Sequence, residues 1–87
     1  MNYLNKNEVL YINCKKQFNR NINQLFIYWS VFSDCYVIRY TKTLKLYKRC
    51  KFVIYDLDYV YLDHIKYKYL SFKIYQKILK TTGNLYL

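Results

Sequence analysis

The chain has 87 residues and carries 15 lysine and arginine residues against 5 aspartate and glutamate residues, a formal net charge of +10. Its length allows one domain, and its hydrophobic content of 54% excludes an intrinsically disordered chain. The longest apolar run covers residues 25–32 and is too short for a membrane-spanning helix, which needs roughly 20 residues. The first residues lack the basic, apolar and small-residue order of a secretory signal, so we expect none.

Residue types with A/T-rich codons dominate the composition. Phe, Tyr, Met, Ile, Asn and Lys make up 47 of the 87 residues, whereas Gly, Ala, Arg and Pro make up 4. This bias indicates an AT-rich gene, as found in reduced organelle genomes, some viruses and some parasites. We therefore expect the protein in the matrix of a mitochondrion or the stroma of a plastid, and we attribute part of its tyrosine and lysine content to codon bias.

The first third of the chain divides into an extension and a strand. Residues 1–24 hold seven of the eight asparagines and are expected to form an N-terminal extension with one short strand at residues 9–12. Apolar residues from Phe18 to Phe32 recur at helical spacing. Residues 25–32 are equally typical of a strand, because aromatic and β-branched side chains favour an extended backbone. We favour the strand.

Apolar and polar side chains alternate between residues 36 and 46. Arg39, Thr41, Thr43 and Lys45 lie between the apolar positions. This period of two predicts a half-buried strand with one basic face. The residues expected on the apolar side, which would face the core of the fold, are Ile38, Leu44, Leu46, Phe52 and Ile54.

Three breaks are predicted before the next long strand. They are a polar bend at residues 48–49, a bulge or a new strand near Tyr55 where the apolar residues change parity, and a turn at residues 63–64. Residues 65–74 then alternate again, with a second change of parity at Leu70.

The C-terminal part completes a mostly β fold. Residues 80–84 are expected to form a loop, and residues 85–87 a last strand. Four or five short antiparallel strands predict a small five-stranded OB-like barrel, which we assign to residues 25–87.

The cysteines do not have the spacing of a metal site. Cys14, Cys35 and Cys50 form no CxxC pair, and His64 is the only histidine. We therefore predict no metal, and we interpret the three cysteines as reduced thiols that pack like small apolar side chains.

Three acidic residues lie close together beside the histidine. Asp56, Asp58 and Asp63 next to His64 could in principle form an acid/base or metal site. The chain offers no second histidine, no serine with a base nearby and no phosphate-binding glycine loop. We therefore interpret these carboxylates as turn and strand-edge residues, and we predict no catalysis and no cofactor.

Positive charge is concentrated in the strand-rich part of the chain. Residues 35–87 carry 11 basic and 3 acidic groups, and the basic residues alternate with tyrosines. Lysine and arginine neutralise phosphates and exposed tyrosine rings stack on unpaired bases, so this part is predicted to bind RNA. The residues expected to contact RNA are Lys42, Lys45, Tyr47, Lys48, Arg49, Lys51, Lys66, Tyr67, Lys68 and Lys80, with Tyr47 and Tyr67 as the stacking rings. Two alternatives stay open, namely an anionic membrane or acidic protein surface as the partner, and composition drift without a partner.

Several short motifs occur in the order found in a known family. Val31-Phe32-Ser33-Asp34 resembles the end of that family's first strand, and Lys42-Thr43 resembles the pair before its second strand. Tyr55-Asp56, Leu62-Asp63 and residues 78–83 follow in similar places. On these motifs, residues 25–87 resemble the small-subunit ribosomal protein seventeen family. The resemblance implies a five-stranded OB-fold barrel that binds ribosomal RNA.

Charge and resemblance together predict a non-catalytic structural protein of an organellar ribosome. Its partners would be ribosomal RNA and neighbouring ribosomal proteins, with no small-molecule substrate and no transmembrane segment. Trp29 is expected in the core or at a protein interface. The alternative is an accessory subunit of a large organellar membrane complex, held by protein and lipid contacts. A third possibility is a small viral regulator that binds a host protein.

Overall fold

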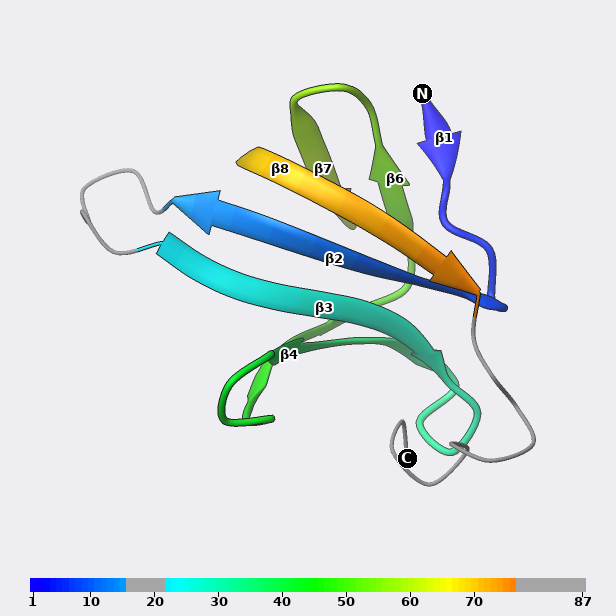
Figure 1. Cartoon of the computed structure of the whole chain (residues 1–87). Coiled ribbons are helices and arrows are strands. Elements are labelled where there is room, and N and C mark those ends of the chain that lie inside the picture. Colours follow the sequence, from blue (N-terminus) through cyan, green and yellow to red (C-terminus); the bar gives the residue numbers. More distant parts are fainter. Residues whose placement is uncertain (16–21, 77–87) are drawn as a thin grey trace.

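The computed structural model describes residues 1–15 and 22–76, which form one antiparallel sheet of eight strands (Figure 1). In chain order the strands are β1 (Asn2–Tyr3), β2 (Glu8–Lys15), β3 (Ile22–Ser30), β4 (Cys35–Tyr40), β5 (Leu46–Cys50), β6 (Val53–Tyr55), β7 (Tyr59–Leu62) and β8 (Ile65–Gln76). Across the sheet they lie in the order β1-β6-β7-β8-β2-β3-β4-β5, so β1 and β5 are its edges. The prediction of a mostly β fold is confirmed. Of the ambiguous apolar run, residues 25–30 belong to a strand, β3, and residues 31–32 to the turn that follows it.

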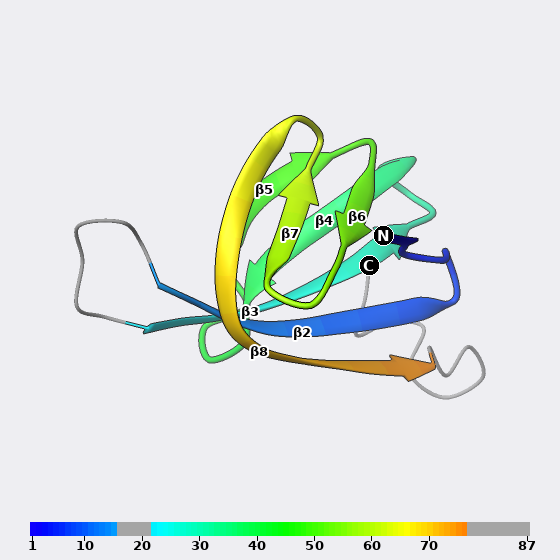
Figure 2. The same cartoon turned by 90° about the horizontal axis from the view of Figure 1, so that it is seen from above.

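The sheet is strongly curled but not closed. β8 pairs through residues 65–68 with β7 and through residues 69–76 with β2, and it bends between the two partners (Figure 2). Asn13 pairs with Ser71 and Cys14 with Tyr69, so Leu70 is an extra residue, a β-bulge that bends the strand. This bulge explains the change of parity in the sequence. The described residues thus differ from the expected five-stranded barrel, because they form eight strands whose edges β1 and β5 are not paired with each other.

The main hydrophobic core lies inside the curl. Leu10, Ile27, Ile38 and Val60, from four different strands, are fully buried there. Each comes from the apolar set that points to one face of its strand, because successive side chains alternate between the two faces. The core therefore fills the space that the bend of β8 creates between the two halves of the sheet.

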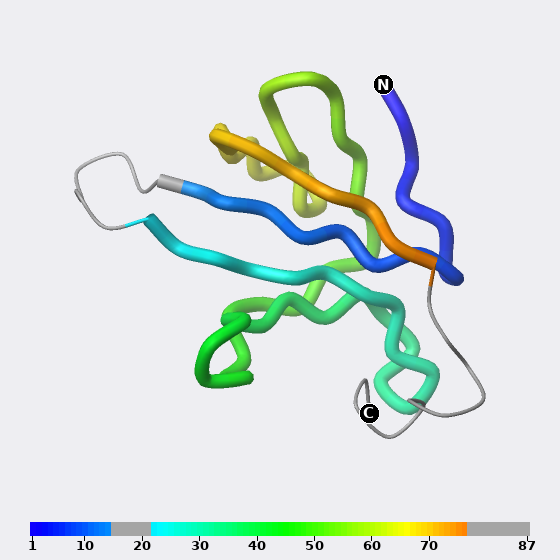
Figure 3. The backbone as a smooth tube through the Cα atoms, in the orientation of Figure 1, coloured from blue at the N-terminus to red at the C-terminus, as the bar shows by residue number. Residues whose placement is uncertain are grey.

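The segment around Leu4 crosses the open side of the curl. Its backbone N–H donates to the Val53 carbonyl at 3.0 Å, and its carbonyl accepts a hydrogen bond from the Tyr36 hydroxyl. Figure 3 shows this N-terminal segment beside β6, with which β1 pairs although the two are far apart in the sequence. Because residues of β4 and β6 both bond to Leu4, the start of the chain ties the two halves of the sheet together.

The described residues of the expected N-terminal extension are instead part of the sheet. β2 pairs with β3 on one side and with β8 on the other, and its side chains Val9, Leu10 and Ile12 are buried. A boundary at residues 24–25 would fall inside β3, so it does not divide this sheet. The short strand expected at residues 9–12 is present but longer. The asparagines around it hid the apolar pattern that makes β2 a central strand.

A second apolar cluster covers the outer face of β2, β3 and β4. It consists of Val9, Phe26, Tyr28, Cys35 and Val37, all buried. In β3 the residues alternate between this cluster and the inner core, so both faces of the strand are apolar. A strand that is buried on both faces reads as a continuous apolar run. This is why the sequence between residues 25 and 30 fitted a helix and a strand equally well.

Only part of the expected apolar side lies inside the curl. Only Ile38 is buried there. Ile54 is half-buried but lies between Val53 and Tyr55, which point into the core, so its side chain is on the outer face. Leu44, Leu46 and Phe52 are 55%, 40% and 58% exposed. The expectation is wrong for these four because it assumed one continuous alternation. The chain instead turns after β4, where Leu44 has a positive φ of 61°, and the pairing of β5 with β4 then shifts register.

The predicted breaks correspond to two of the observed ones. The turn at residues 63–64 is confirmed. The break expected near Tyr55, as a bulge or a new strand, corresponds to a new strand, β6, which begins at Val53 and ends at Tyr55. The bend expected at residues 48–49 is wrong, since both lie inside β5 and the chain bends at residues 51–52 instead. The loop and strand expected at residues 80–87 lie outside the described residues.

The three cysteines are buried and free, as small apolar side chains would be. Burial raises the pKa of the Cys14 thiol from 9.0 to about 11 and that of the Cys50 thiol to about 12. Both thiols are therefore protonated near neutral pH. Because the unfolded chain would lose these protons at lower pH than the folded chain, their contribution to stability is full below pH 9 and declines above it.

Candidate nucleic-acid interface

One hairpin concentrates the positive charge of the chain. Residues 39–51, called the basic hairpin below, contain the end of β4, the connecting loop, β5 and the following bend. This segment has six cations and no carboxylate. The six are Arg39, Lys42, Lys45, Lys48, Arg49 and Lys51. Five of them belong to the predicted RNA-contact set, and the fold holds these five on one continuous edge.

The basic hairpin presents most of these cations to solvent. Lys42, Lys45, Arg49 and Lys51 are exposed, and Lys48 is half-buried. Among the eight described strands β5 has one neighbour, β4, so its other side is an edge of that sheet. At about 3.3 Å per residue, the backbone between Lys45 and Lys51 extends over roughly 20 Å. The hairpin is therefore a narrow basic rim that can meet several negative groups at once.

Backbone hydrogen bonds hold the loop of the hairpin in shape. The Leu44 N–H donates to the Tyr40 carbonyl at 2.9 Å, and the Tyr40 N–H donates to the Lys45 carbonyl at 3.0 Å. Arg39 connects the loop to β3. Its Nε donates to the Tyr28 hydroxyl at 3.1 Å, and its Nη1 donates to the Leu44 carbonyl in the loop at 3.0 Å. Arg39 was not among the predicted site residues, and its role here is to position the loop that carries Lys42 and Lys45.

The two tyrosines predicted to stack on bases pack against the protein. The ring of Tyr47 lies 5.5 Å from that of Tyr40 and 6.4 Å from that of Tyr67, both in edge-on arrangements. Burial, and then the neighbouring Tyr67, raise the pKa of Tyr47 to about 12. Lys48 Nζ lies 5.8 Å from the centre of the Tyr67 ring. As placed, both rings join β5 to β8 across the open side of the curl, and their stacking on bases stays a prediction.

Lys66 and Lys68 form a second basic group on β8. They pair with Tyr61 and Tyr59 of β7, and Lys66 Nζ lies 4.0 Å from the centre of the Tyr59 ring. Because Tyr67 between them points to the core, the two lysines point to the opposite face, and both are exposed. Lys66 and Lys68 therefore belong to a different strand from the basic hairpin and point away from the core. Lys80 lies outside the described residues.

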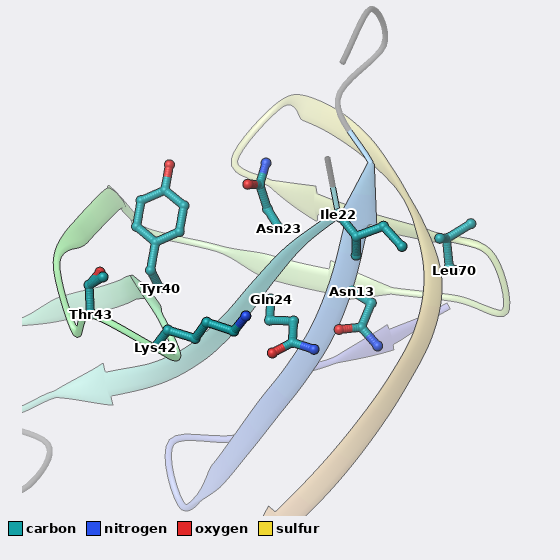
Figure 4. A pocket seen from close by; sticks show the side chains of 8 residues that line it. All are labelled: Asn13, Ile22, Asn23, Gln24, Tyr40, Lys42, Thr43 and Leu70. Atoms are coloured by element: carbon teal, nitrogen blue, oxygen red, sulfur yellow. The ribbon is translucent and has the colours of Figure 1, made fainter. Parts of the chain in front are cut away.

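A hollow of about 510 Å³ adjoins the loop of the basic hairpin (Figure 4). Its lining consists of Asn13, Ile22, Asn23, Gln24, Tyr40, Lys42, Thr43 and Leu70. Of these, only Lys42 was predicted from the sequence to be a site residue. The amides were missed because residues 1–24, which contain Asn13, Asn23 and Gln24, were assigned to an N-terminal extension. The signal that could have found Asn13 is its position between the apolar residues Ile12 and Cys14, which places an amide on the outer face of a strand.

The clustered aspartates serve turns. Asp63 Oδ1 accepts hydrogen bonds from the backbone N–H groups of Lys51 at 2.8 Å and Phe52 at 3.0 Å. Asp56 Oδ1 accepts from the N–H groups of Asp58 at 3.1 Å and Tyr59 at 2.9 Å. No group of three or more potential metal ligands exists within residues 1–15 and 22–76. These contacts agree with the interpretation of the carboxylates as turn residues.

Asp63→Ala is expected to lower the free energy of unfolding by about 2 kcal/mol, because two backbone N–H groups lose their acceptor and alanine must adopt a positive φ. The φ of Asp63 is 58°. Asp63→Asn is the matched control, since asparagine keeps the acceptor oxygen and tolerates this backbone conformation, and its cost should stay below about 1 kcal/mol. Urea denaturation measures both. Equal losses in the two variants would contradict this role.

No match was found when the sequence was compared with models of known protein families, with curated proteins or with solved structures. Across the described part of the chain, no helix has the length and apolar character needed to cross a membrane.

Proposed function

We propose that the protein binds RNA without catalysis, and that the basic hairpin supplies the main contact. The observation that carries this proposal is the placement of six cations and no carboxylate on one edge strand and its adjoining segments. Lysine and arginine side chains on such a rim can neutralise backbone phosphates and release their counterions. Hydrogen bonds from Arg39 and within the loop hold part of this charge in place before binding.

The overall charge supports a polyanionic partner. The protein carries a net charge of +10 on 10.9 kDa, so its cationic side chains repel one another in the folded state. A bound polyphosphate would relieve that repulsion. Lys66 and Lys68, on β8, would contact a second segment of the same folded RNA.

We propose further that the RNA is ribosomal and that the protein is a structural component of an organellar ribosome. The excess of residue types with A/T-rich codons and the resemblance of residues 25–87 to the small-subunit ribosomal protein seventeen family support this assignment. In such a particle, neighbouring ribosomal proteins would cover exposed apolar side chains such as Val31, Phe32 and Leu57. OB folds bind RNA through a surface of their sheet. This protein would bind RNA in the same way, but with a sheet that has additional strands.

The proposal is tested by the salt dependence of binding. Fluorescence anisotropy of a labelled, folded ribosomal RNA fragment should show an affinity that falls about 10³-fold or more between 50 and 200 mM salt. Vesicles containing phosphatidylserine form the second arm of the experiment. Association with RNA that does not respond to salt, or no association, would overturn the proposal. Tighter binding to the vesicles than to RNA would favour the accessory subunit of a membrane complex.

A further inference from the structure

We infer that the outer face of the sheet, beside the basic hairpin, holds one unpaired nucleotide of the RNA, whose base edge is read by Asn13 and Gln24. This inference rests on the proposed RNA-binding function and adds to it a specific site and a preference for a base. It comes from the way in which the sheet aligns polar side chains from four segments of the chain.

The site is a row of polar side chains that crosses the sheet. Asn13 of β2 pairs with Ser71 of β8 on one side and with Gln24 of β3 on the other. Thr41, just after β4, donates its N–H to the Gln24 carbonyl at 2.9 Å. Directly paired residues in an antiparallel sheet point to the same face, so these side chains form one row, called the amide row below.

Two hollows meet at the amide row. The hollow of about 510 Å³ and a neighbouring one of about 400 Å³ share Asn13 and Gln24 in their linings. Both volumes fall in the range of roughly 300–1,000 Å³ that is typical of small-ligand sites. Lys42 lines the first hollow and Lys73 the second, and neither lining includes an acidic residue. The row therefore has a cation at each end and no negative charge between them.

The side chains of the amide row lie next to one another, and hydrogen bonds hold part of the row in place. In Figure 4 the Lys42 side chain extends toward Gln24, whose amide lies between Lys42 and Asn13. Asn13 Nδ2 donates to the Ser71 hydroxyl at 2.7 Å, which fixes the orientation of that amide. The Gln24 side chain is exposed, while its backbone is fixed by Thr41, whose hydroxyl also donates to the Gln24 carbonyl at 3.2 Å. One amide is therefore oriented in advance, and the other can adjust.

The chemistry of the row matches a nucleotide. A side-chain amide both donates and accepts hydrogen bonds, and it forms a bidentate pair with N6 and N7 of adenine. Unpaired RNA bases expose these edges to protein side chains. Lys42 and Lys73 can take the phosphates on the two sides of that nucleotide. We therefore expect an adenine at this site, with the strand continuing from Lys42 onto the basic hairpin.

The test compares single-stranded RNA 12-mers of adenine, cytosine and uracil by fluorescence anisotropy with the full chain. The protein should bind the adenine 12-mer at least about 5-fold more tightly than the other two. Gln24→Met keeps the length of the side chain and removes its hydrogen-bonding groups, so it should abolish this preference while the salt dependence stays the same. Gln76→Met, the same change at an exposed residue outside both hollows, is the matched control and should keep the preference.

The outcomes separate the site from the function. Salt-dependent RNA binding without a preference for adenine would overturn the site and leave the proposed function standing. A preference that survives in Gln24→Met would also overturn it. If the chain binds neither the 12-mers nor folded RNA, the proposed function fails and the site fails with it. Loss of the preference in Gln24→Met, with Gln76→Met unchanged, establishes the site.

Discussion

Ile38→Ala is expected to lower the free energy of unfolding by about 2–5 kcal/mol, whereas Leu44→Ala should lower it by about 1 kcal/mol or less. Both substitutions remove the same number of carbon atoms, and the sequence predicts both side chains on the same apolar side. In the structure Ile38 is fully buried in the core and Leu44 is 55% exposed in the hairpin loop. The difference arises because only the Ile38 substitution leaves a cavity among packed side chains.

Urea or thermal denaturation measures the free energy of unfolding of the Ile38→Ala and Leu44→Ala variants. In a domain of this size, each kcal/mol lowers Tm by roughly 4–8 °C, so the two variants are easily separated. If Ile38→Ala does not fold at all, Ile38→Val provides the measurement, with an expected loss of about 0.5–1.5 kcal/mol. Equal losses for Ile38 and Leu44 would mean that the two share an environment, as the simple alternation predicted, and would contradict the described fold.

Replacing five cations of the basic hairpin by glutamine is expected to weaken RNA binding about 10³-fold at 0.1 M salt. The changes are Lys42→Gln, Lys45→Gln, Lys48→Gln, Arg49→Gln and Lys51→Gln. Each phosphate contact with single-stranded RNA contributes about 0.7 to the slope of log affinity against log salt, so the slope should become shallower by about 3.5. Arg39 is left in place because its hydrogen bonds to Tyr28 and Leu44 hold the loop.

The control keeps the charge and changes the side chains. Lys→Arg at the four hairpin lysines, with Arg49 unchanged, retains five positive charges, and the salt slope should stay as in the unmodified chain. Circular dichroism is the check that the glutamine variant and the arginine variant both remain folded. If the glutamine variant keeps its slope, RNA is bound elsewhere, and the lysines of β8 become the first alternative.

The composition and the local alternation of the sequence were enough to predict a β fold. They also located the turn at residues 63–64 and a new strand close to Tyr55. The same alternation failed after Tyr40, because a turn and a register shift move the following residues to different faces, and neither leaves a clear mark in the sequence. The position of β2 was missed for a different reason. Its apolar residues are separated by asparagines that resemble a disordered extension, and only its pairing with β3 and β8 makes it central.

The candidate site was predictable only in part. The exposed cations of the hairpin could be identified because charge density along the chain is a local property. The placement of Tyr47 and Tyr67 was not predictable, since their contact across the curl depends on how far β8 bends at Leu70. The amide row could not be found at all. Asn13 and Ser71 are far apart in the sequence and become neighbours only through the pairing of β2 with β8.

The sequence by itself determined the charge, the extended backbone and the absence of cysteine pairs at metal-ligand spacing, because each of these depends on residue identity or on neighbours along the chain. The tertiary structure alone decided which face of each strand is inside, which cations share an edge and which amides meet. Those properties depend on the register between distant strands. A shift of one residue exchanges the two faces of a strand, and the register here is set by the bulge at Leu70 and the turn after Tyr40.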